Sequence, residues 1–367
     1  MAVKVEGRKV RYAVVGAGWI SQAAFMPGVA HTGNSEMTAI VTGDQAKAEA
    51  LGRRYGIERT YHYDAYRAAL ESGGFDALYL ASPNWQHREF AVPALEAGLH
   101  VLLEKPMATT EDDCRAIMAA ARKGGGKLMI AYRLHFEPAT LEALRLVHSG
   151  ALGRVGMFTS TFGQHVSAAN HRAQHGFWAG PVADMGPYPI NAARNLFRAE
   201  PTEVMAWGTR TQGFGFDDTV SVLLRFPFDQ MAQFTVAYGL NAIDEYRVWG
   251  SDGDLLVSPG FTLGAALHHR LTLGESATES RFPHVDQFGG ETAYFSDCIL
   301  GDRDPEPDGE EGLLDVRVVA AIGRALETGR TQELAPLRRA KQPMPDQARN
   351  LPPVKTPPMV NAAAPGG

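Results

Sequence analysis

The chain has 367 residues, which at a usual size of about 150 residues per domain suggests two domains. Lys and Arg total 35 and Asp and Glu total 41, so the formal net charge is −6. An acidic chain without a basic block argues against nucleic acid and anionic membrane as partners, because both are bound through clustered Lys and Arg. Two cysteines, Cys114 and Cys298, are too few for a disulfide framework, and we expect a reducing compartment.

Charged residues are scattered through the first eleven positions, which is not typical of a secretory leader. No apolar run approaches the roughly 18 to 20 residues needed to span a bilayer. We therefore expect a cytoplasmic protein. We also expect its partners to be a small-molecule substrate and further copies of itself, in a dimer or tetramer.

In the first third of the chain, short apolar runs alternate with helical patterns, which is typical of βαβ units and a parallel sheet. The pattern predicts strands at 10–15, 36–41, 77–81, 100–103 and 127–131, and helices at 46–55, 90–97 and 110–123. These elements predict a doubly wound α/β Rossmann domain over residues 1–134.

The pattern changes after residue 134. A helix is expected at 138–148, followed by strands at 154–161, 202–209, 219–226, 230–238 and 246–250 and helices at 287–300 and 313–328. Strands joined by short turns usually pair antiparallel, so residues 135–335 should form an α+β domain with a large, open, mostly antiparallel sheet. Residues 336–367 are rich in proline and are expected to be an extended arm or a disordered tail.

The segment Gly16-Ala17-Gly18-Trp19-Ile20-Ser21 follows the first predicted strand and opens a helix. In this context a G-x-G-x-x-G/A pattern binds a dinucleotide pyrophosphate, because the glycines allow a tight turn and a close approach of the backbone. Ser21 stands at the third glycine position and is small enough for close packing. Gly16, Gly18, Trp19 and Ile20 are therefore candidate cofactor-binding residues.

The end of the second strand indicates which dinucleotide is bound. NAD sites usually place a carboxylate there for the ribose 2′-OH, whereas this chain has Thr42 and Gly43. Lys47 lies one helical turn further on and can pair with a 2′-phosphate. Asp44 is either a displaced carboxylate or the N-cap of the next helix. We favour the cap, and with it NADP held by Thr42, Gly43 and Lys47.

Further polar residues follow later strands of the predicted sheet. Glu104 and Lys105 end the strand at 100–103, and Ser82, Asn84 and His87 lie at the same edge one strand earlier. The carboxyl ends of parallel strands border the ligand crevice, so Lys105 should face the reacting groups, where an ammonium can take part in proton transfer. A surface lysine and a helix-start histidine are the alternative interpretations.

In the second half, Asp184 and Tyr188 are four residues apart and share a face if the turn between them is helical. A tyrosine beside a lysine can exchange a proton with a sugar hydroxyl; the alternative is a helix cap and a packed tyrosine. His171 and His175 have i, i+4 spacing but lie in a loop pattern without an acidic partner, so no metal site is expected.

Several segments together resemble the glucose-fructose oxidoreductase, inositol dehydrogenase and rhizopine catabolism (Gfo/Idh/MocA) family. The resemblance rests on the Gly-rich turn, on residues 82–87, 97–106 and 127–136, on Asp184 to Tyr188, and on Glu310 to Arg317. Within the family, Tyr132-Arg133-Leu134-His135 and the Asp-x-Gly-x-Tyr pattern are most similar to glucose-fructose oxidoreductases. Pro187 and Pro189, which flank Tyr188, are unusual for that group.

The resemblance implies an NADP-dependent sugar oxidoreductase that converts an aldose at C1 to a lactone. It implies that Lys105 and Tyr188 form the acid/base pair, that Asp184 binds substrate and that Arg133 lies near the cofactor. It also implies tightly bound NADP that a second sugar reoxidises. Two alternatives remain open: a dehydrogenase or reductase of another sugar or diol with freely exchanging NADP(H), and a regulator that senses a dinucleotide without catalysis.

Overall fold

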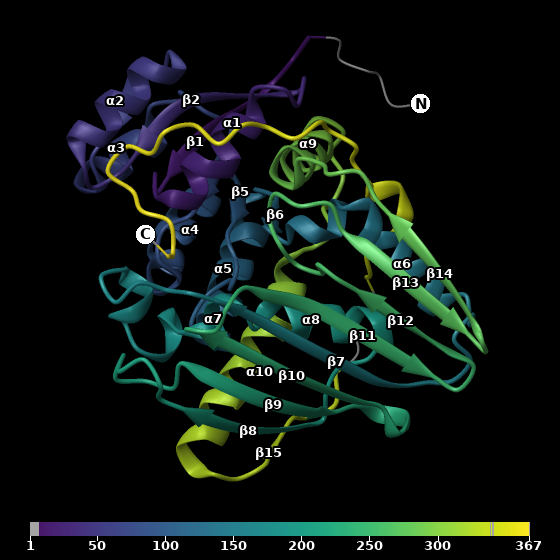
Figure 1. The fold of residues 1–367 in the computed structure, drawn as a ribbon. Helices are drawn as coiled ribbons and strands as arrows, with labels where there is room; N and C mark the ends of the chain where they lie inside the picture. Colours follow the sequence, from purple (N-terminus) through teal and green to yellow (C-terminus); the bar gives the residue numbers. More distant parts are fainter. Residues whose placement is uncertain (1–6, 338, 340, 367) are drawn as a thin grey trace. The chain divides into compact units, whose positions relative to one another are not determined.

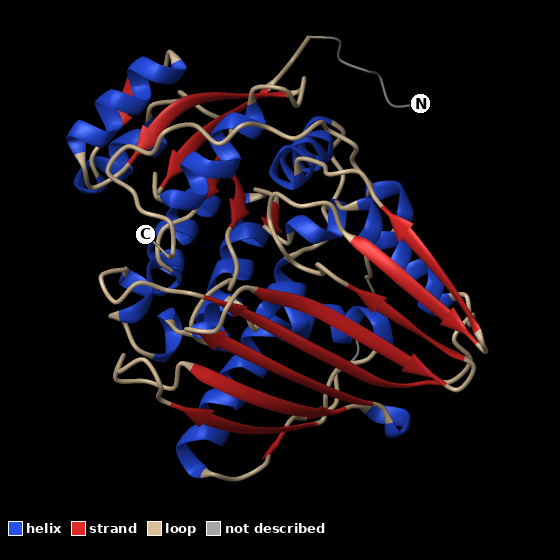
Figure 2. Ribbon diagram, viewed as in Figure 1, coloured by secondary structure: helices blue, strands red, loops and turns tan. Residues whose placement is uncertain are grey.

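The computed structural model describes residues 7–337, 339 and 341–366, and the chain forms two compact units. The first unit contains Met1–Phe136, Asp286–Leu313 and Arg349–Ala364, and the second contains Glu137–Val285, Leu314–Ala348 and Pro365–Gly367. Each unit is built on one sheet, shown as red arrows in Figure 2.

The first unit has a six-stranded parallel sheet in the order β3-β2-β1-β4-β5-β6. Its strands are β1 (Val10–Val15), β2 (Ser35–Val41), β3 (Arg59–Tyr61), β4 (Ala77–Leu80), β5 (His100–Leu103) and β6 (Leu128–Ile130). This is the strand order of a Rossmann fold, and it confirms the predicted doubly wound sheet. The sequence pattern missed β3, which has only three residues, none of them buried.

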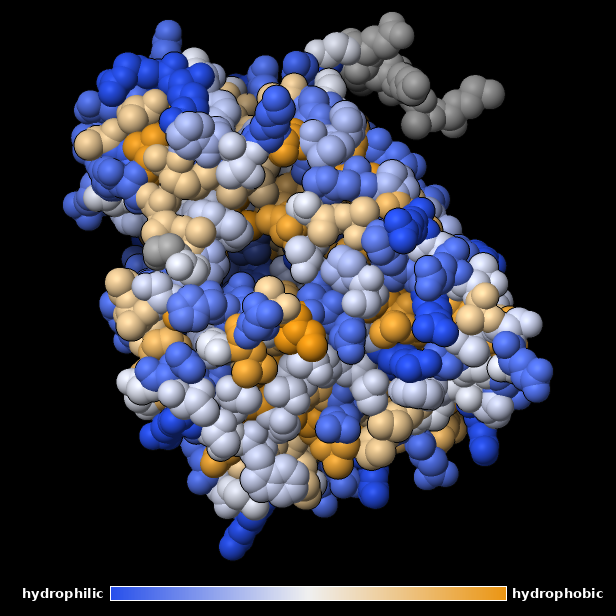
Figure 3. Space-filling model, viewed as in Figure 1, coloured by the Kyte–Doolittle hydropathy of each residue, from blue (hydrophilic) through white to orange (hydrophobic). Residues whose placement is uncertain are grey.

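Helices connect these strands, and their ends follow local sequence signals. They are α1 (Met26–Val29), α2 (Gln45–Tyr55), α3 (Tyr66–Glu71), α4 (His87–Glu96) and α5 (Glu111–Gly124). Thr110 caps α5 by accepting a hydrogen bond from the Asp113 N–H, and Gly125 ends it in the left-handed conformation. Charged side chains cover the outward face of α2, which is hydrophilic in Figure 3.

A later helix, α9 (Gln287–Leu300), also belongs to the first unit. The hydroxyls of Tyr12 on β1 and Ser296 on α9 are hydrogen-bonded at 2.8 Å, and Asn34 donates to Asp297 at 2.8 Å. These buried contacts explain why the first unit is not one continuous stretch. The expected linear division at residues 134 and 335 therefore differs from the compact units, because α9 and the part of the proline-rich tail from Arg349 to Ala364 belong to the first unit.

The second unit has a nine-stranded sheet in the order β14-β13-β12-β11-β7-β10-β9-β8-β15. Its strands are β7 (Val155–Gln164), β8 (Glu203–Thr209), β9 (Thr219–Arg225), β10 (Met231–Tyr238), β11 (Ile243–Gly250), β12 (Gly253–Val257), β13 (His268–Leu273), β14 (Ser276–Arg281) and β15 (Gln332–Glu333). Every neighbouring pair is antiparallel except β7 and β10, so the predicted mostly antiparallel sheet is confirmed. The pattern missed β12 to β14; β14 is exposed throughout and has no apolar alternation.

The core of the second unit lies on one face of this sheet. Phe158, Phe234 and Val248 are fully buried there, and α6 (Pro138–His148), α8 (Pro187–Phe197) and the part of α10 (Gly309–Thr328) from Leu314 onward belong to the same unit. Large apolar side chains such as Trp207 and Trp249 remain exposed. In the described part of the chain no helix is long and apolar enough to cross a membrane.

Candidate functional site

The Gly-rich turn after β1 has the geometry of a nucleotide-binding turn. Gly16 has a φ of 88°, and a Cβ at this position would meet the backbone of Ala81 at 2.6 Å, so only glycine fits. A Cβ on Gly18 would meet nothing within 4 Å, which leaves open space above the turn. Ser21 donates to Gly16 O at 2.5 Å and closes the turn, while the half-buried Trp19 and Ile20 begin the helical segment. The turn therefore fits a pyrophosphate.

The end of β2 brings together the residues expected to select the cofactor. Thr42 is buried and its N–H donates to Tyr61 O at 3.1 Å; Gly43 follows it at the surface. Asp44 caps α2, as predicted, and accepts from the Lys47 N–H at 2.9 Å. That bond, followed by a bond from Asn361 Nδ2 at 3.0 Å, lowers the pKa of Asp44. Both carboxylate oxygens are thus already engaged.

The loop after β4 carries Ser82, Asn84 and His87. The Ser82 hydroxyl is buried and has no hydrogen-bond partner among the described residues, as expected of a group that faces a ligand. His87 is fully buried: its Nε2 lies 2.9 Å from Ser82 O, and its Nδ1 lies 3.1 Å from Pro106 O. Burial lowers the pKa of His87 to about 4, so the neutral ring fixes this loop to the segment after β5.

At the end of β5, the half-buried Lys105 follows the buried Glu104. Glu104 accepts from the Tyr79 hydroxyl at 2.8 Å and from the Lys105 N–H at 3.2 Å, so the carboxylate fixes the backbone that carries the ammonium. Arg133, also buried, donates to Gln287 on α9. Burial raises the pKa of Glu104, while Lys105 and Arg133 act against this effect.

Sequence analysis missed a second buried carboxyl group in this cluster. Glu291 on α9 is fully buried, and neither of its carboxyl oxygens has a hydrogen-bond partner among the described residues. Burial, and then repulsion by Glu104, raises the pKa of Glu291 well above its ordinary value. The available signal was a carboxylate flanked by Phe288, Tyr294 and Phe295 in a predicted helix. Burial thus favours the protonated form of the Glu291 carboxyl.

This raised pKa predicts a pH-dependent effect of Glu291→Gln on stability. The folded state holds the Glu291 proton more tightly than the unfolded state, so stability is lost as pH rises above the unfolded pKa. We expect the Tm of Glu291→Gln, relative to the parent protein, to increase from pH 5 to pH 9. An exposed control, Glu310→Gln, should show no such trend, and a constant Tm difference for Glu291→Gln would contradict the assignment.

The second unit holds Asp184 in a fixed environment. Asp184 ends α7 (Pro181–Asp184), and its Oδ2 accepts from Arg172 Nε at 3.0 Å, from the Tyr238 hydroxyl at 3.0 Å and from Gln164 at 3.5 Å. Burial, and then the Asp184 carboxylate, raises the pKa of Tyr238. The hydroxyl therefore stays protonated and donates a hydrogen bond to Asp184. Three donors thus hold a partly exposed carboxylate in one orientation. Sequence analysis missed all three.

Tyr188 lies in the first turn of α8, which Pro187 begins at a position where proline suits a helix. Its ring lies 5.6 Å from that of Phe162 on β7 and 5.8 Å from that of Phe261, centroid to centroid. A Cβ on Gly186 would meet Val182 O at 2.2 Å, so glycine is required for the turn between Asp184 and Tyr188. The turn holds both residues at partly exposed positions, Asp184 at the end of α7 and Tyr188 at the start of α8.

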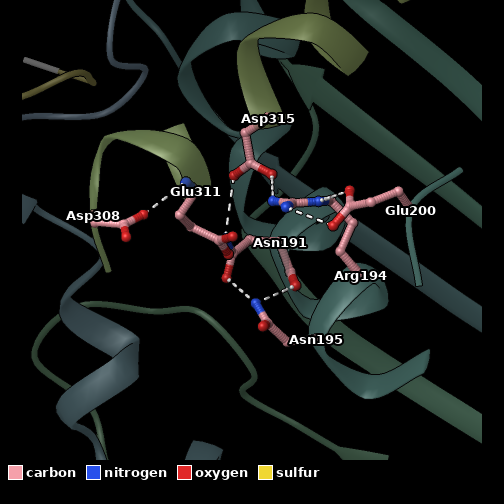
Figure 4. A network of polar contacts seen from close by, with 7 residues as sticks. All are labelled: Asn191, Arg194, Asn195, Glu200, Asp308, Glu311 and Asp315. Atoms are coloured by element: carbon pink, nitrogen blue, oxygen red, sulfur yellow. Dashed lines mark hydrogen bonds and ion pairs between the residues drawn. The ribbon is translucent and has the colours of Figure 1, made fainter. Parts of the chain in front are cut away.

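A buried polar network links α8 to α10 (Figure 4). Arg194 on α8 donates to Asp315 on α10 and, through two nitrogens, to Glu200 at 2.6 and 2.9 Å. Asn191 donates to the other Asp315 oxygen at 3.3 Å. Arg194 is 3% exposed and Asp315 is 0% exposed. The network anchors the helix that carries Tyr188 to α10.

The predicted site residues therefore fall into two groups. The cofactor candidates and Lys105 lie in the first unit, whereas Asp184 and Tyr188 lie in the second. The described residues contain no cluster of three or more metal-ligating side chains, and His175 Nδ1 lies 3.0 Å from His171 O, a backbone atom. A Rossmann domain followed by a second domain with a fixed carboxylate and a tyrosine defines the class of two-domain dinucleotide-dependent oxidoreductases.

Comparisons with known proteins agree with this class. Residues 10–132 match the sequence model described as "Oxidoreductase family, NAD-binding Rossmann fold", and residues 140–256 match the GFO/IDH/MocA C-terminal domain. The chain belongs to the Gfo/Idh/MocA oxidoreductase family, which confirms the resemblance seen in the sequence.

One relative and two solved structures are similar over 87% to 89% of this chain. A D-xylose 1-dehydrogenase (NADP(+)) of Haloferax volcanii is 31% identical over 88% of this chain and 99% of its own. The crystal structure of an aldose-aldose oxidoreductase from Caulobacter crescentus with glycerol is 35% identical over 89% and 100% of the two chains, with a TM-score of 0.83. A 3-ketoreductase from Actinomadura kijaniata, with NADP and TDP-benzene, is 25% identical over 87% and 98%, with a TM-score of 0.80.

Proposed function

We propose that the protein is an NADP-dependent sugar oxidoreductase that oxidises an aldose at C1 to a lactone. The observation that carries this proposal is the similarity, over both domains, to an NADP-dependent xylose dehydrogenase and an aldose-aldose oxidoreductase. The family models also match residues in both units, 10–132 in the first and 140–256 in the second.

The residues of the first unit fit NADP. Gly16 and Gly18 form the proposed pyrophosphate turn, and the buried Ser82 hydroxyl has no hydrogen-bond partner among the described residues. The end of β2 carries Thr42 and Gly43 in place of the carboxylate that usually binds the ribose hydroxyls of NAD, and Asp44 caps α2 instead. Lys47, one turn further, supplies a positive charge for the 2′-phosphate of NADP.

In the proposed reaction, bound NADP supplies the hydride acceptor. Tyr188 takes the proton of the C1 hydroxyl, and Lys105 is the other member of the proposed acid/base pair. Asp184, fixed by Arg172 and Tyr238, accepts hydrogen bonds from sugar hydroxyls and orients C1. Two electrons and one proton leave C1 as hydride and one proton leaves the hydroxyl, so the product is the lactone. We further propose that NADP stays bound and is reoxidised by a second sugar.

The test begins with the purified protein. Nucleotide released by heating should be NADP rather than NAD. In the unheated protein, D-xylose or D-glucose should reduce the bound nucleotide, with a rise in absorbance at about 340 nm. If the cofactor remains bound, turnover should continue on addition of a second sugar without added NADP. Release of NAD, or no reduction by any aldose tested, would contradict the proposal. The proposed dimer or tetramer is tested separately by analytical ultracentrifugation.

A further inference from the structure

The C-terminal segment Arg349–Ala364 contains no helix or strand, yet it packs with the first unit. At its start, the Arg349 N–H donates to Phe136 O at 2.9 Å, and Leu351 O accepts from the Asp286 N–H at 2.9 Å. In Figure 1 this segment, in yellow, runs from α9 past α1 toward α2 and α3. We call Arg349–Ala364 the C-terminal strap.

The first anchor of the strap is Gln22, which follows the Gly-rich turn. Its Nε2 donates to Val360 O at 2.9 Å, and its Oε1 accepts from the Val360 N–H at 2.8 Å. The same Nε2 donates to Ala17 O, inside the turn, at 2.9 Å. The Gln22 side chain is completely buried. Two of the three hydrogen bonds of its amide are made to the backbone of Val360, 338 positions later in the chain. A buried amide without these partners is costly, and this pairing is therefore specific.

The second anchor is Asp44 at the end of β2. Asn361 Nδ2 donates to Asp44 Oδ2 at 3.0 Å, and Arg54 on α2 donates to Pro358 O at 2.7 Å. These contacts hold adjacent residues of the strap against the two places where a Rossmann domain binds a dinucleotide. Gln22 lies beside the pyrophosphate turn, and Asp44 lies where the adenosine ribose is bound.

The composition of the strap suits a docked segment. Pro352, Pro353, Pro357 and Pro358 restrict the backbone and lack an N–H donor, so they form no ladder of hydrogen bonds. Restricted residues lose less conformational freedom when they become ordered. The strap is therefore held by a few side-chain anchors and can release without unfolding a helix or strand.

We propose that the C-terminal strap closes over the nucleotide-binding edge of the first unit and slows the escape of bound NADP(H). This inference rests on the proposed function and deepens it: Val360 and Asn361 complete the cofactor site, and their release controls whether the cofactor exchanges. The strap makes the cofactor a long-lived part of the enzyme, which a second sugar must then reoxidise.

Two truncations separate the effect of Val360 and Asn361, the strap residues that bond to Gln22 and Asp44, from the effect of the last residues of the chain. A chain that ends at Met359 lacks Val360 and Asn361, whereas a chain that ends at Ala364 keeps both and is the matched control. NADPH dissociation is measured by stopped-flow fluorescence after an excess of NADP⁺ is added. Loss of the anchoring hydrogen bonds should raise the dissociation rate by about 10- to 100-fold in the shorter chain. The control should remain within about twofold of the full chain.

The outcomes distinguish this inference from the proposed function. If all three chains bind NADPH and release it at the same rate, the strap is overturned while the cofactor assignment stands. If none binds NADPH and all bind NADH, the proposed cofactor is wrong. A faster release confined to the chain that ends at Met359 supports the strap.

A second measurement uses the full chain and does not depend on the folding of a truncated one. The Val360 N–H, bonded to Gln22, should exchange with deuterium several-fold more slowly when NADPH saturates the protein. Asn361→Ala should weaken this protection and raise the NADPH dissociation rate. Exchange of the peptide 355–364 that does not respond to NADPH would overturn the proposal.

Discussion

Lys105→Met and Tyr188→Phe are each expected to reduce kcat for aldose oxidation by about 10²- to 10⁴-fold, the usual contribution of a positioned proton acceptor. Tyr188→Phe removes the hydroxyl that we propose takes the C1 proton but keeps the ring beside Phe162 and Phe261. Lys105→Met keeps most of the side-chain volume but removes the charge. Steady-state rates with a saturating aldose measure both effects.

Folding and nucleotide binding should survive both substitutions, because neither side chain is in the buried core. The Tm and the NADP content of the variants are therefore expected to match the parent protein. Lys123→Met, at an exposed ion pair with Glu96, is the matched control and should keep full turnover. Unchanged kcat in both site variants would remove the proposed acid/base pair.

The strength of the local pattern decided which parts of the fold could be predicted. Continuous apolar runs such as β1 and β5, and helices with a cap such as Thr110, are signals that neighbouring residues carry together. β3 and β14 lack such signals because they lie at sheet edges and bury few side chains. Their positions depend on pairing with strands already in place, which a local pattern does not encode.

The same distinction applies to the candidate site. The Gly-rich turn, Asp44 as a helix cap and Lys105 at a strand end follow from residues adjacent in sequence. Arg172 and Tyr238 reach Asp184 only because the fold brings a loop and β10 beside α7. The proline pattern correctly excluded helix and strand from the strap, but its docking depends on Gln22, whose partner lies at the far end of the chain.

The largest effect on stability is expected from Arg194→Met. This substitution removes the guanidinium that now neutralises two largely buried carboxylates, Asp315 and Glu200. Breaking one side of a buried ion pair typically costs about 3 to 5 kcal/mol of unfolding free energy. Urea unfolding, followed by tryptophan fluorescence, should show the loss in the transition of the second unit, which contains Arg194 and Asp315.

Arg225→Met is the control, because Arg225 pairs with Glu203 at the surface of the same sheet and exposed pairs contribute less than about 1 kcal/mol. The double variant Arg194→Met with Asp315→Leu should regain part of the stability, since it also removes the buried Asp315 carboxylate that the single variant leaves without the Arg194 guanidinium. Equal losses of unfolding free energy in Arg194→Met and Arg225→Met would show that the buried network stabilises the second unit no more than an exposed ion pair does. A partial recovery confined to the double variant would show that α8, and Tyr188 with it, is fixed by charge compensation rather than by packing alone.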